Sequence, residues 1–144
     1  MPTSRELHGL KEASRKMRAI AREYDTDRVA GALYRRGTAI MSDSQENYVP
    51  VDRGTLKNSG HVVPPKRDGR VVRVWLAYGG AASAYAIAVH EHPSGFSPPS
   101  WKGVVVQFAA GRGPKYLERP LFKAVGTMAE DIARDLALNR SGAA

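Results

Sequence analysis

The apolar residues near the start of the chain recur at the spacing of an α-helix. Between Arg5 and Tyr24 they lie three, four or seven positions apart, at Leu7, Leu10, Met17, Ile20 and Tyr24. Charged residues take many of the positions between them. The pattern predicts an amphipathic helix of about 20 residues, roughly 30 Å long.

A second apolar stripe, which follows a polar interruption, predicts a helix over about 27–44. Gly31 and Gly37 each weaken such a helix by about 1 kcal/mol relative to alanine, so we expect close packing on another element to be their reason. Residues 42–53 are polar and rich in turn formers. They predict a loop.

The clearest strand pattern lies at 70–78, where β-branched and aromatic residues alternate with a period of two. Upstream, residues 61–63 predict a short strand that Pro64 and Pro65 bring to an end. The sequence between the two runs contains Arg-Asp-Gly at 67–69, which is suited to a turn. The two runs therefore predict an antiparallel hairpin.

The second half of the chain alternates between regular and broken patterns. The alanine-rich segment 81–91 predicts a short helix, and 92–103 is irregular because it is rich in proline and glycine. Residues 104–108 form a short β-like run. From Pro120 to about Asn139 an apolar stripe predicts a long last helix, with the proline in its first turn.

These elements predict one α+β domain over residues 1–144, with helices at about 5–44, a small antiparallel sheet within about 59–108 and a long C-terminal helix at about 120–139. The chain has 144 residues, of which 42% are hydrophobic and 25% charged, as in an average globular domain. It has no cysteine, which excludes disulfides, thiolate metal sites and cysteine nucleophiles. No apolar run reaches the roughly 20 residues of a membrane span, and no secretory signal pattern is present, so we expect a soluble protein made in the cytoplasm.

The charge balance is basic and regional. Lys and Arg number 22 against 14 Asp and Glu, giving a net charge of +8. Residues 53–73 contain six of the basic residues and a single acid, Asp68. This balance is typical of proteins that meet nucleic acid, an acidic protein surface or an anionic membrane, and does not choose among them.

Within this basic region, the hairpin makes nucleic acid a serious alternative, because cations neutralise phosphates and an aromatic ring stacks on bases. Trp75 lies among the basic residues Lys57, Lys66, Arg67, Arg70 and Arg73. Trp75 also shares its predicted face with Val71 and Ala77. A packed tryptophan and a stacking platform therefore both remain open.

Residues that carry chemistry do not occur at a catalytic or metal-binding spacing. His90 and His92 are two positions apart, which places them some 200° apart on a helix, whereas a zinc-binding helix has its histidines four apart. No spacing ties Asp52, Glu91, Glu118 and His90 into an acid–base set, and no serine lies in a nucleophile elbow. We expect no enzyme, no catalytic, cofactor-binding or metal-binding residue and no small-molecule substrate.

Three segments, 49–59, 85–91 and 115–121, carry short motifs in a fixed order. The residues that define the motifs are Pro50, Asp52, Gly54, Leu56, Ser59, Tyr85, Glu91, Tyr116 and Pro120. Together they resemble the signature of small neck proteins of tailed bacteriophages, a family of minor capsid, tail-completion and head–tail connector components. Arg53 stands where the family usually has threonine, His90 precedes the acid of the second motif, and the proline-rich stretch 93–101 is longer than the family's usual turn.

The motif residues are expected to be scaffold features. The Asp52 carboxylate is suited to binding its own turn, Gly54 to a positive φ, and Pro120 to setting the start of the last helix. The surfaces would then carry the function. The expected aromatic anchors are Phe96, Trp101 and Tyr116, and the expected charged contacts are Arg67, Arg70 and Arg112.

The resemblance implies a structural virion protein at the head–tail junction, made in the host cytoplasm and present as a ring of copies. Its implied partners are copies of itself, connector or portal-proximal proteins and tail proteins, with packaged DNA as a further contact and no membrane. Two alternatives remain: a tail terminator that caps the tail tube, and a basic DNA-binding accessory protein. Substitution of Trp101 by Ala should leave the monomer folded and impair assembly.

Overall fold

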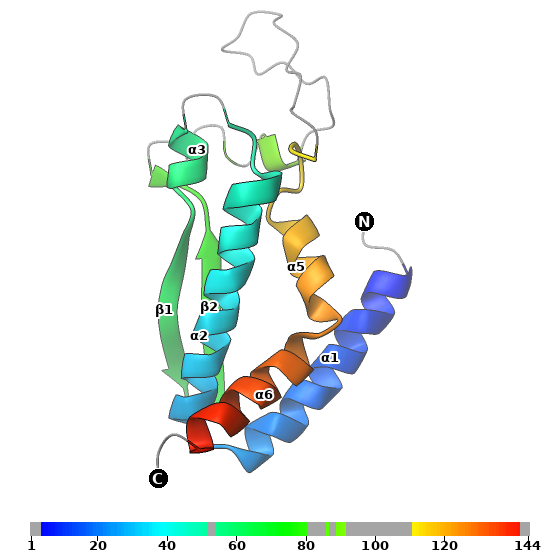
Figure 1. Ribbon diagram of the computed structural model, residues 1–144, viewed down its shortest axis with the longest axis vertical. Helices are drawn as coiled ribbons and strands as arrows, with labels where there is room; N and C mark the ends of the chain where they lie inside the picture. The colour runs from blue at the N-terminus through cyan, green and yellow to red at the C-terminus, as the bar shows by residue number, and fades with distance from the viewer. Residues whose placement is uncertain (1–3, 52–53, 81–85, 87–88, 92–110, 142–144) are drawn as a thin grey trace, which may run out of the picture.

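The computed structural model describes residues 4–51, 54–80, 86, 89–91 and 111–141, and it has the predicted α+β architecture (Figure 1). Helices α1 (Ser4–Glu23) and α2 (Thr26–Asp43) open the chain. A short π-helix, η1 (Ser44–Tyr48), continues directly from α2, and the one-turn helix α3 (Thr55–Asn58) follows. The two long helices α1 and α2 confirm the helices predicted from the spacing of the apolar residues.

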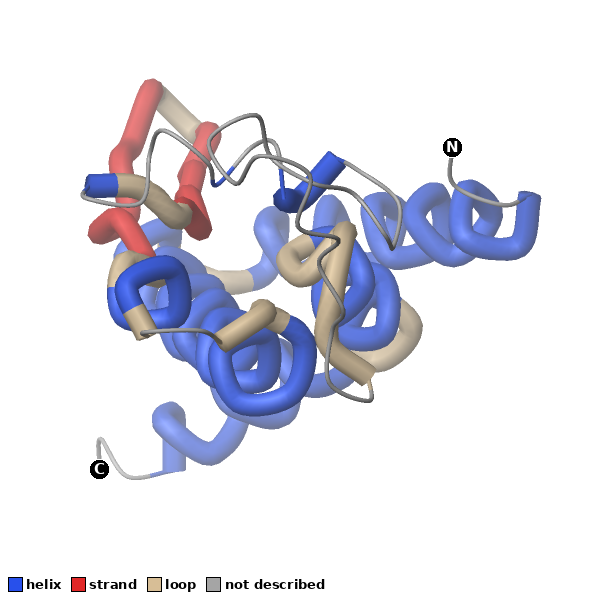
Figure 2. Tube along the Cα trace, turned by 90° about the horizontal axis from the view of Figure 1, so that it is seen from above, coloured by secondary structure: helices blue, strands red, loops and turns tan. Residues whose placement is uncertain are grey.

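Helix α2 forms the middle layer of the molecule. The hairpin of β1 (His61–Asp68) and β2 (Val71–Ala77) packs on one side of it, while α1, α5 (Glu118–Val125) and α6 (Met128–Ser141) lie on the other side (Figures 1 and 2). The helical side holds the larger core, which α1, α2 and α6 build together. Its buried members are Ile20, Val29, Ala32, Ala129, Ile132 and Leu136.

Ion pairs reinforce the contacts between helices. Arg35 donates to both carboxylate oxygens of Asp135, at 2.7 and 2.9 Å, and Arg36 lies 3.3 Å from Asp131, so α2 is tied to α6 at two places. Lys16 pairs with Glu130 and so links α1 to α6. The ion pairs therefore join the same helices that the apolar stripes pack together.

The hairpin is antiparallel, as predicted, but β1 is longer than predicted. It continues through Pro64 and Pro65 to Asp68 instead of ending at the prolines. The register shifts between Val63 and Lys66, where two prolines on β1 lie across from Val74 alone on β2. The prediction was wrong because prolines are tolerated at an irregularity in an edge strand, where no ladder hydrogen bond is required of them.

Gly37 explains how the hairpin lies so close to α2. A Cβ atom at this position would stand 3.3 to 3.4 Å from side-chain atoms of Val62, Val74 and Leu76. The glycine thus confirms the expectation of close packing. At Gly31 the three atoms nearest to such a Cβ all belong to the guanidinium of Arg35, a residue of the same helix, at 3.3 to 3.9 Å.

Two further expectations need correction. Residues 44–48 are π-helical, not a loop, because the turn gains tertiary partners that the local sequence does not reveal. The single helix expected over about 120–139 is present as α5 and α6, separated at Gly126 and Thr127. Thr127 restarts the helix: its carbonyl accepts from the Asp131 amide at 2.9 Å and its hydroxyl donates to the Asp131 carboxylate at 2.8 Å.

The middle of the chain is described only in part. Of the helix expected at 81–91, Ala86 and residues 89–91 are described and are helical. The strand-like run at 104–108 lies outside the described residues, as do Asp52, Tyr85, Phe96 and Trp101 among the residues expected to matter. The sheet of the described residues consists of β1 and β2.

Candidate functional site

The C-terminal end of α2 is organised around the buried hydroxyl of Ser44. Its Oγ donates to the Tyr116 carbonyl at 2.6 Å and shares a 2.7 Å hydrogen bond with the Tyr78 hydroxyl. The Tyr78 and Tyr116 rings meet edge to face, with centroids 4.9 Å apart. Burial raises the pKa of Tyr78, and the bond to Ser44 opposes that rise, so the phenol stays protonated at neutral pH.

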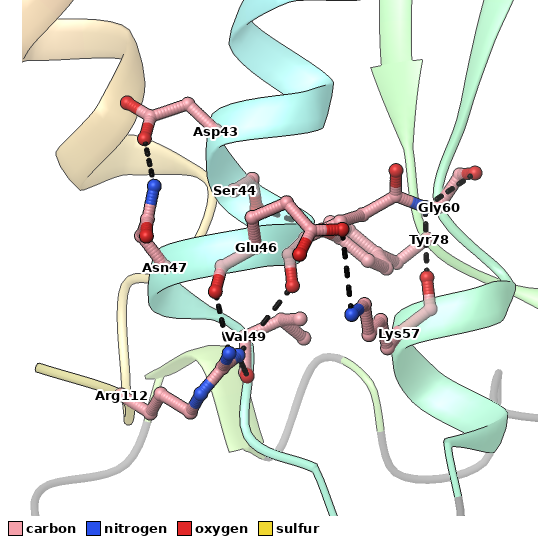
Figure 3. Close-up of polar contacts among 10 residues, drawn as sticks. Asp43, Ser44, Glu46, Asn47, Val49, Lys57, Gly60, Tyr78 and Arg112 are labelled. Carbon is pink, nitrogen blue, oxygen red and sulfur yellow. Dashed lines mark hydrogen bonds and ion pairs between the residues drawn. The ribbon is translucent and has the colours of Figure 1, made fainter. Parts of the chain in front are cut away.

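The π-helix that begins at Ser44 closes with the amide of Val49, which donates to the Ser44 carbonyl at 2.8 Å. A π-turn leaves carbonyls without an intrahelical donor, and Arg112 supplies one. Its guanidinium donates to the carbonyl oxygens of Val49 at 2.7 Å, Glu46 at 2.5 Å and Gln45 at 3.4 Å (Figure 3). Arg112 is therefore a cap inside the chain instead of the surface contact expected from the sequence.

The same π-helix also holds α3 in place. The Gln45 side-chain amide donates to the carbonyls of Lys57 at 2.8 Å and Gly60 at 3.2 Å. The Lys57 ammonium lies 3.4 Å from the Glu46 carboxylate (Figure 3). Gly60 has no room for a side chain, because a Cβ there would stand 2.7 Å from the Tyr78 ring.

The three motif segments, far apart in the sequence, pack into one cluster, which we call the motif junction. Its buried residues are Val49, Leu56, Ala86 and Tyr116. The first two come from segment 49–59, Ala86 from segment 85–91 and Tyr116 from segment 115–121. Tyr116 donates its hydroxyl to the Ala86 carbonyl at 2.7 Å, which joins the second segment directly to the third.

The remaining described motif residues have local structural roles. Gly54 precedes α3 and has a φ of 81°, which confirms the expected positive φ. Ser59 donates to the Leu56 carbonyl at 2.7 Å and accepts from the Gly79 amide at 3.2 Å. Pro120 is buried in the first turn of α5, and Pro50 is half-buried. Tyr116 is 2% exposed, so it belongs to the core and not to an exposed interface.

Glu91 lies at the edge of the junction in an exposed cluster of charges. Lys115 contacts the Glu91 carboxylate at 2.5 Å and Glu118 at 3.3 Å, and the His90 ring lies 2.8 Å from Glu91. Lys115, followed by His90, lowers the pKa of Glu91, so this carboxylate is ionised and unsuited to act as a proton donor. Lys115 has a φ of 58°, uncommon for a residue other than glycine, and its amide donates to the His90 carbonyl at 2.7 Å.

A shallow hollow of about 370 Å³ lies beside this end of the hairpin. It is lined by Thr55, Asn58, Ser59, His61, Gly79 and Gly80. The Ser59 hydroxyl is engaged with the backbone, and the His61 ring contacts the Ser59 carbonyl at 2.9 Å. The hollow thus offers hydroxyl, amide and imidazole groups without a carboxylate partner in its lining.

The second candidate surface is the outer hairpin face, which we define as Val63, Lys66, Asp68, Val71, Arg73 and Trp75. Register pairs Val63 with Trp75 and Lys66 with Arg73, and the opposite face packs on α2 at Gly37. Trp75 is 44% exposed and Val71 48%. The Lys66 ammonium lies 5.9 Å from the centroid of the Trp75 ring. The tryptophan is thus not packed in the core of the described chain.

The two other arginines expected at an interface differ in their surroundings. Arg67 faces the α2 side of the hairpin and contacts Asp27 at 2.6 Å. Arg70 is exposed in the turn. Of the hairpin cations named from the sequence, Lys66, Arg70 and Arg73 point outward, while Arg67 is paired within the chain.

Sequence reasoning missed Ser44, Gln45 and Tyr78 at the motif junction. Ser44 and Gln45 lie in a polar run that resembles a loop, and their partners are 12 to 72 residues away. Contacts over such distances along the chain leave no pattern in the local sequence.

Within the part of the chain that the structure describes, no group of His, Asp and Glu side chains is arranged to hold a metal ion. No helix among the described residues has both the length and the apolar character of a membrane crossing. Comparison with protein-family models, with curated proteins and with solved structures finds no match to this chain.

Proposed function

We propose that the chain is a structural subunit of a tailed-phage virion that joins the head to the tail as one member of a ring. The observation that supports this most is the motif junction. Three segments that resemble the phage neck-protein signature contribute Val49, Leu56, Ala86 and Tyr116 to one buried cluster. Motifs that specify one shared fold are expected to meet in space, and these three segments do so.

The polar groups of the junction also favour a scaffold over a catalytic site. Ser44, Arg112 and Gln45 direct their hydrogen bonds to backbone carbonyls, and the Tyr116 hydroxyl does the same. Groups used in this way fix the chain and are not available to a substrate. If the motif residues serve the fold, the function is carried by the exposed surfaces. A ring subunit works in this way, because it contacts its neighbours through its surfaces.

Electron microscopy of lysate from a phage in which this gene is inactivated tests the proposal. We expect DNA-filled heads to accumulate beside separate tails of normal length, and a plasmid copy of the gene to restore joined particles. Tails of uncontrolled length would identify a tail terminator instead. Intact infectious particles would contradict both structural functions.

A further inference from the structure

The outer hairpin face has an arrangement of charge that the fold does not need. Register places Lys66 directly across from Arg73 on the two strands. Two like charges in opposed positions of an antiparallel pair destabilise it. The nearest acid, Asp68, is 85% exposed and 3.7 Å from Arg73, so it offsets the repulsion weakly. An anion held between the two cations would remove the repulsion.

We propose that the outer hairpin face binds double-stranded DNA, with Lys66, Arg70 and Arg73 on phosphates and Trp75 against the groove. This goes beyond the proposed joining of heads to tails and does not depend on it. An antiparallel ribbon of two strands has the width to enter a major groove about 12 Å wide. The eight residues of β1 span about 26 Å along it.

The cations are exposed, and the one ion pair among them, Arg73 with Asp68 at 3.7 Å, lies in solvent and is weak enough for a phosphate to replace. Arg70 is exposed in the turn and makes no hydrogen bond or ion pair with any residue that the structure describes. Arg73 is 52% exposed. Lys66 lies over the Trp75 ring, so cation and aromatic surface are presented together. By contrast, Arg67 and Arg112 are held by Asp27 and by backbone carbonyls.

A duplex matches this surface better than an acidic protein does, because it supplies closely spaced anions at regular intervals to cations that lie at successive levels of the ribbon. DNA carries about one charge per 1.7 Å of its axis. The cations lie at successive levels, first the Lys66–Arg73 pair and then Arg70 at the turn. An acidic protein surface remains the alternative outcome of the test.

Fluorescence anisotropy of a labelled duplex of about 30 base pairs, titrated with the full chain, measures this contact. Three phosphate contacts predict that affinity falls about 40-fold between 50 and 200 mM salt. The variant Lys66→Gln/Arg70→Gln/Arg73→Gln should bind at least 10-fold more weakly and lose most of the salt dependence. Trp75→Ala should weaken binding and keep the salt dependence.

The matched control is Lys11→Gln/Arg18→Gln/Arg22→Gln on α1, which removes the same charge from exposed positions elsewhere. It should change affinity much less than the hairpin variant, with both variants unfolding at the temperature of the unmodified chain. Equal losses in the two variants, or no binding at 50 mM salt, would overturn the proposal. If the hairpin variant binds DNA normally but fails to restore joined particles in the phage, the face meets protein, which also overturns it. Absence of DNA binding leaves the head–tail experiment unaffected, so the two proposals fail separately.

Discussion

The motif junction and the outer hairpin face use polar and aromatic residues in opposite ways. At the junction, Tyr116 is buried and its hydroxyl is bonded to the backbone, and Arg112 donates to carbonyls of the π-helix. On the hairpin, Trp75 is 44% exposed and Arg73 is 52% exposed. Aromatic residues and arginines thus make internal contacts at the junction, whereas on the hairpin they remain accessible to solvent.

This difference separates the parts of the chain that specify the fold from the part that is free to act. Buried polar groups are costly to leave unpaired, so changes at the junction should alter stability. Exposed groups with few internal partners can change with little effect on stability, and their loss is detected only in binding. The following substitutions test whether the two regions separate in this way.

Tyr116→Ala should give the largest effect. It removes a fully buried ring from the cluster and leaves the Ala86 carbonyl without its donor, which should lower the free energy of unfolding by about 3–5 kcal/mol. Tyr116→Phe keeps the ring and should cost about 1 kcal/mol. Urea unfolding followed by circular dichroism measures both, and an unchanged midpoint for the alanine variant would place the ring outside the core.

Gly37→Leu should be the next largest, because its side chain has no space between α2 and the hairpin. We expect a loss of about 1–3 kcal/mol from this overpacking. Gly31→Ala is the matched control on the same helix, where the nearest atoms are the end of the Arg35 side chain, and it should raise stability by up to about 1 kcal/mol. Thermal unfolding should move the two midpoints in opposite directions, and a shift of the same sign in both would contradict the assigned packing.

Arg112→Ala should lower stability by about 1–3 kcal/mol, because it leaves the carbonyls of Val49 and Glu46 without their donor. Arg70→Ala removes the same charge from the turn and should change stability by less than about 0.5 kcal/mol. Parallel urea titrations compare the two arginines directly. Similar losses would mean that the hairpin cations also belong to the fold.

The smallest effect concerns pH. The pKa of Glu130 is lowered by its hydrogen bond to Lys16, so the folded state binds a proton less readily than the unfolded state. The stability from this pair is present above the unfolded pKa of about 4.3 and is lost as the pH falls through the lower folded pKa. Glu130→Gln should therefore differ slightly from the unmodified chain at pH 7, and the difference in thermal midpoint should vanish at strongly acidic pH. A difference that persists there would assign the effect to packing.

The regular elements could be predicted because their signal is local. Helical spacing from Leu7 to Tyr24 and the alternation from Val71 to Ala77 both match the elements that form. The alternation also places Trp75 and Val71 on one face, as found. It does not say which face is buried, because that choice depends on Gly37 of α2.

The π-helix and the roles of the arginines were beyond sequence reasoning for the same reason. A π-helix at Ser44 depends on Tyr78 and Tyr116, which only the folded chain brings near. Arg112 and Arg70 are the same residue type with the same charge. Only the tertiary structure shows that Arg112 donates to backbone carbonyls while Arg70 is an exposed cation. The motifs included Leu56 and Tyr116 of the junction, but they did not indicate which residues these two would contact.

The prolines of β1 have a consequence for the behaviour of the chain at high concentration. Among the described residues the sheet has two strands, so each strand has an outer edge without a neighbouring strand there, and an open edge is a template on which other chains assemble into fibres. Pro64 and Pro65 lack amide hydrogens, and the register shift beside them bends the strand. An incoming strand would therefore meet a gap in the row of donors along β1, and this gap disfavours strand-on-strand association at this edge.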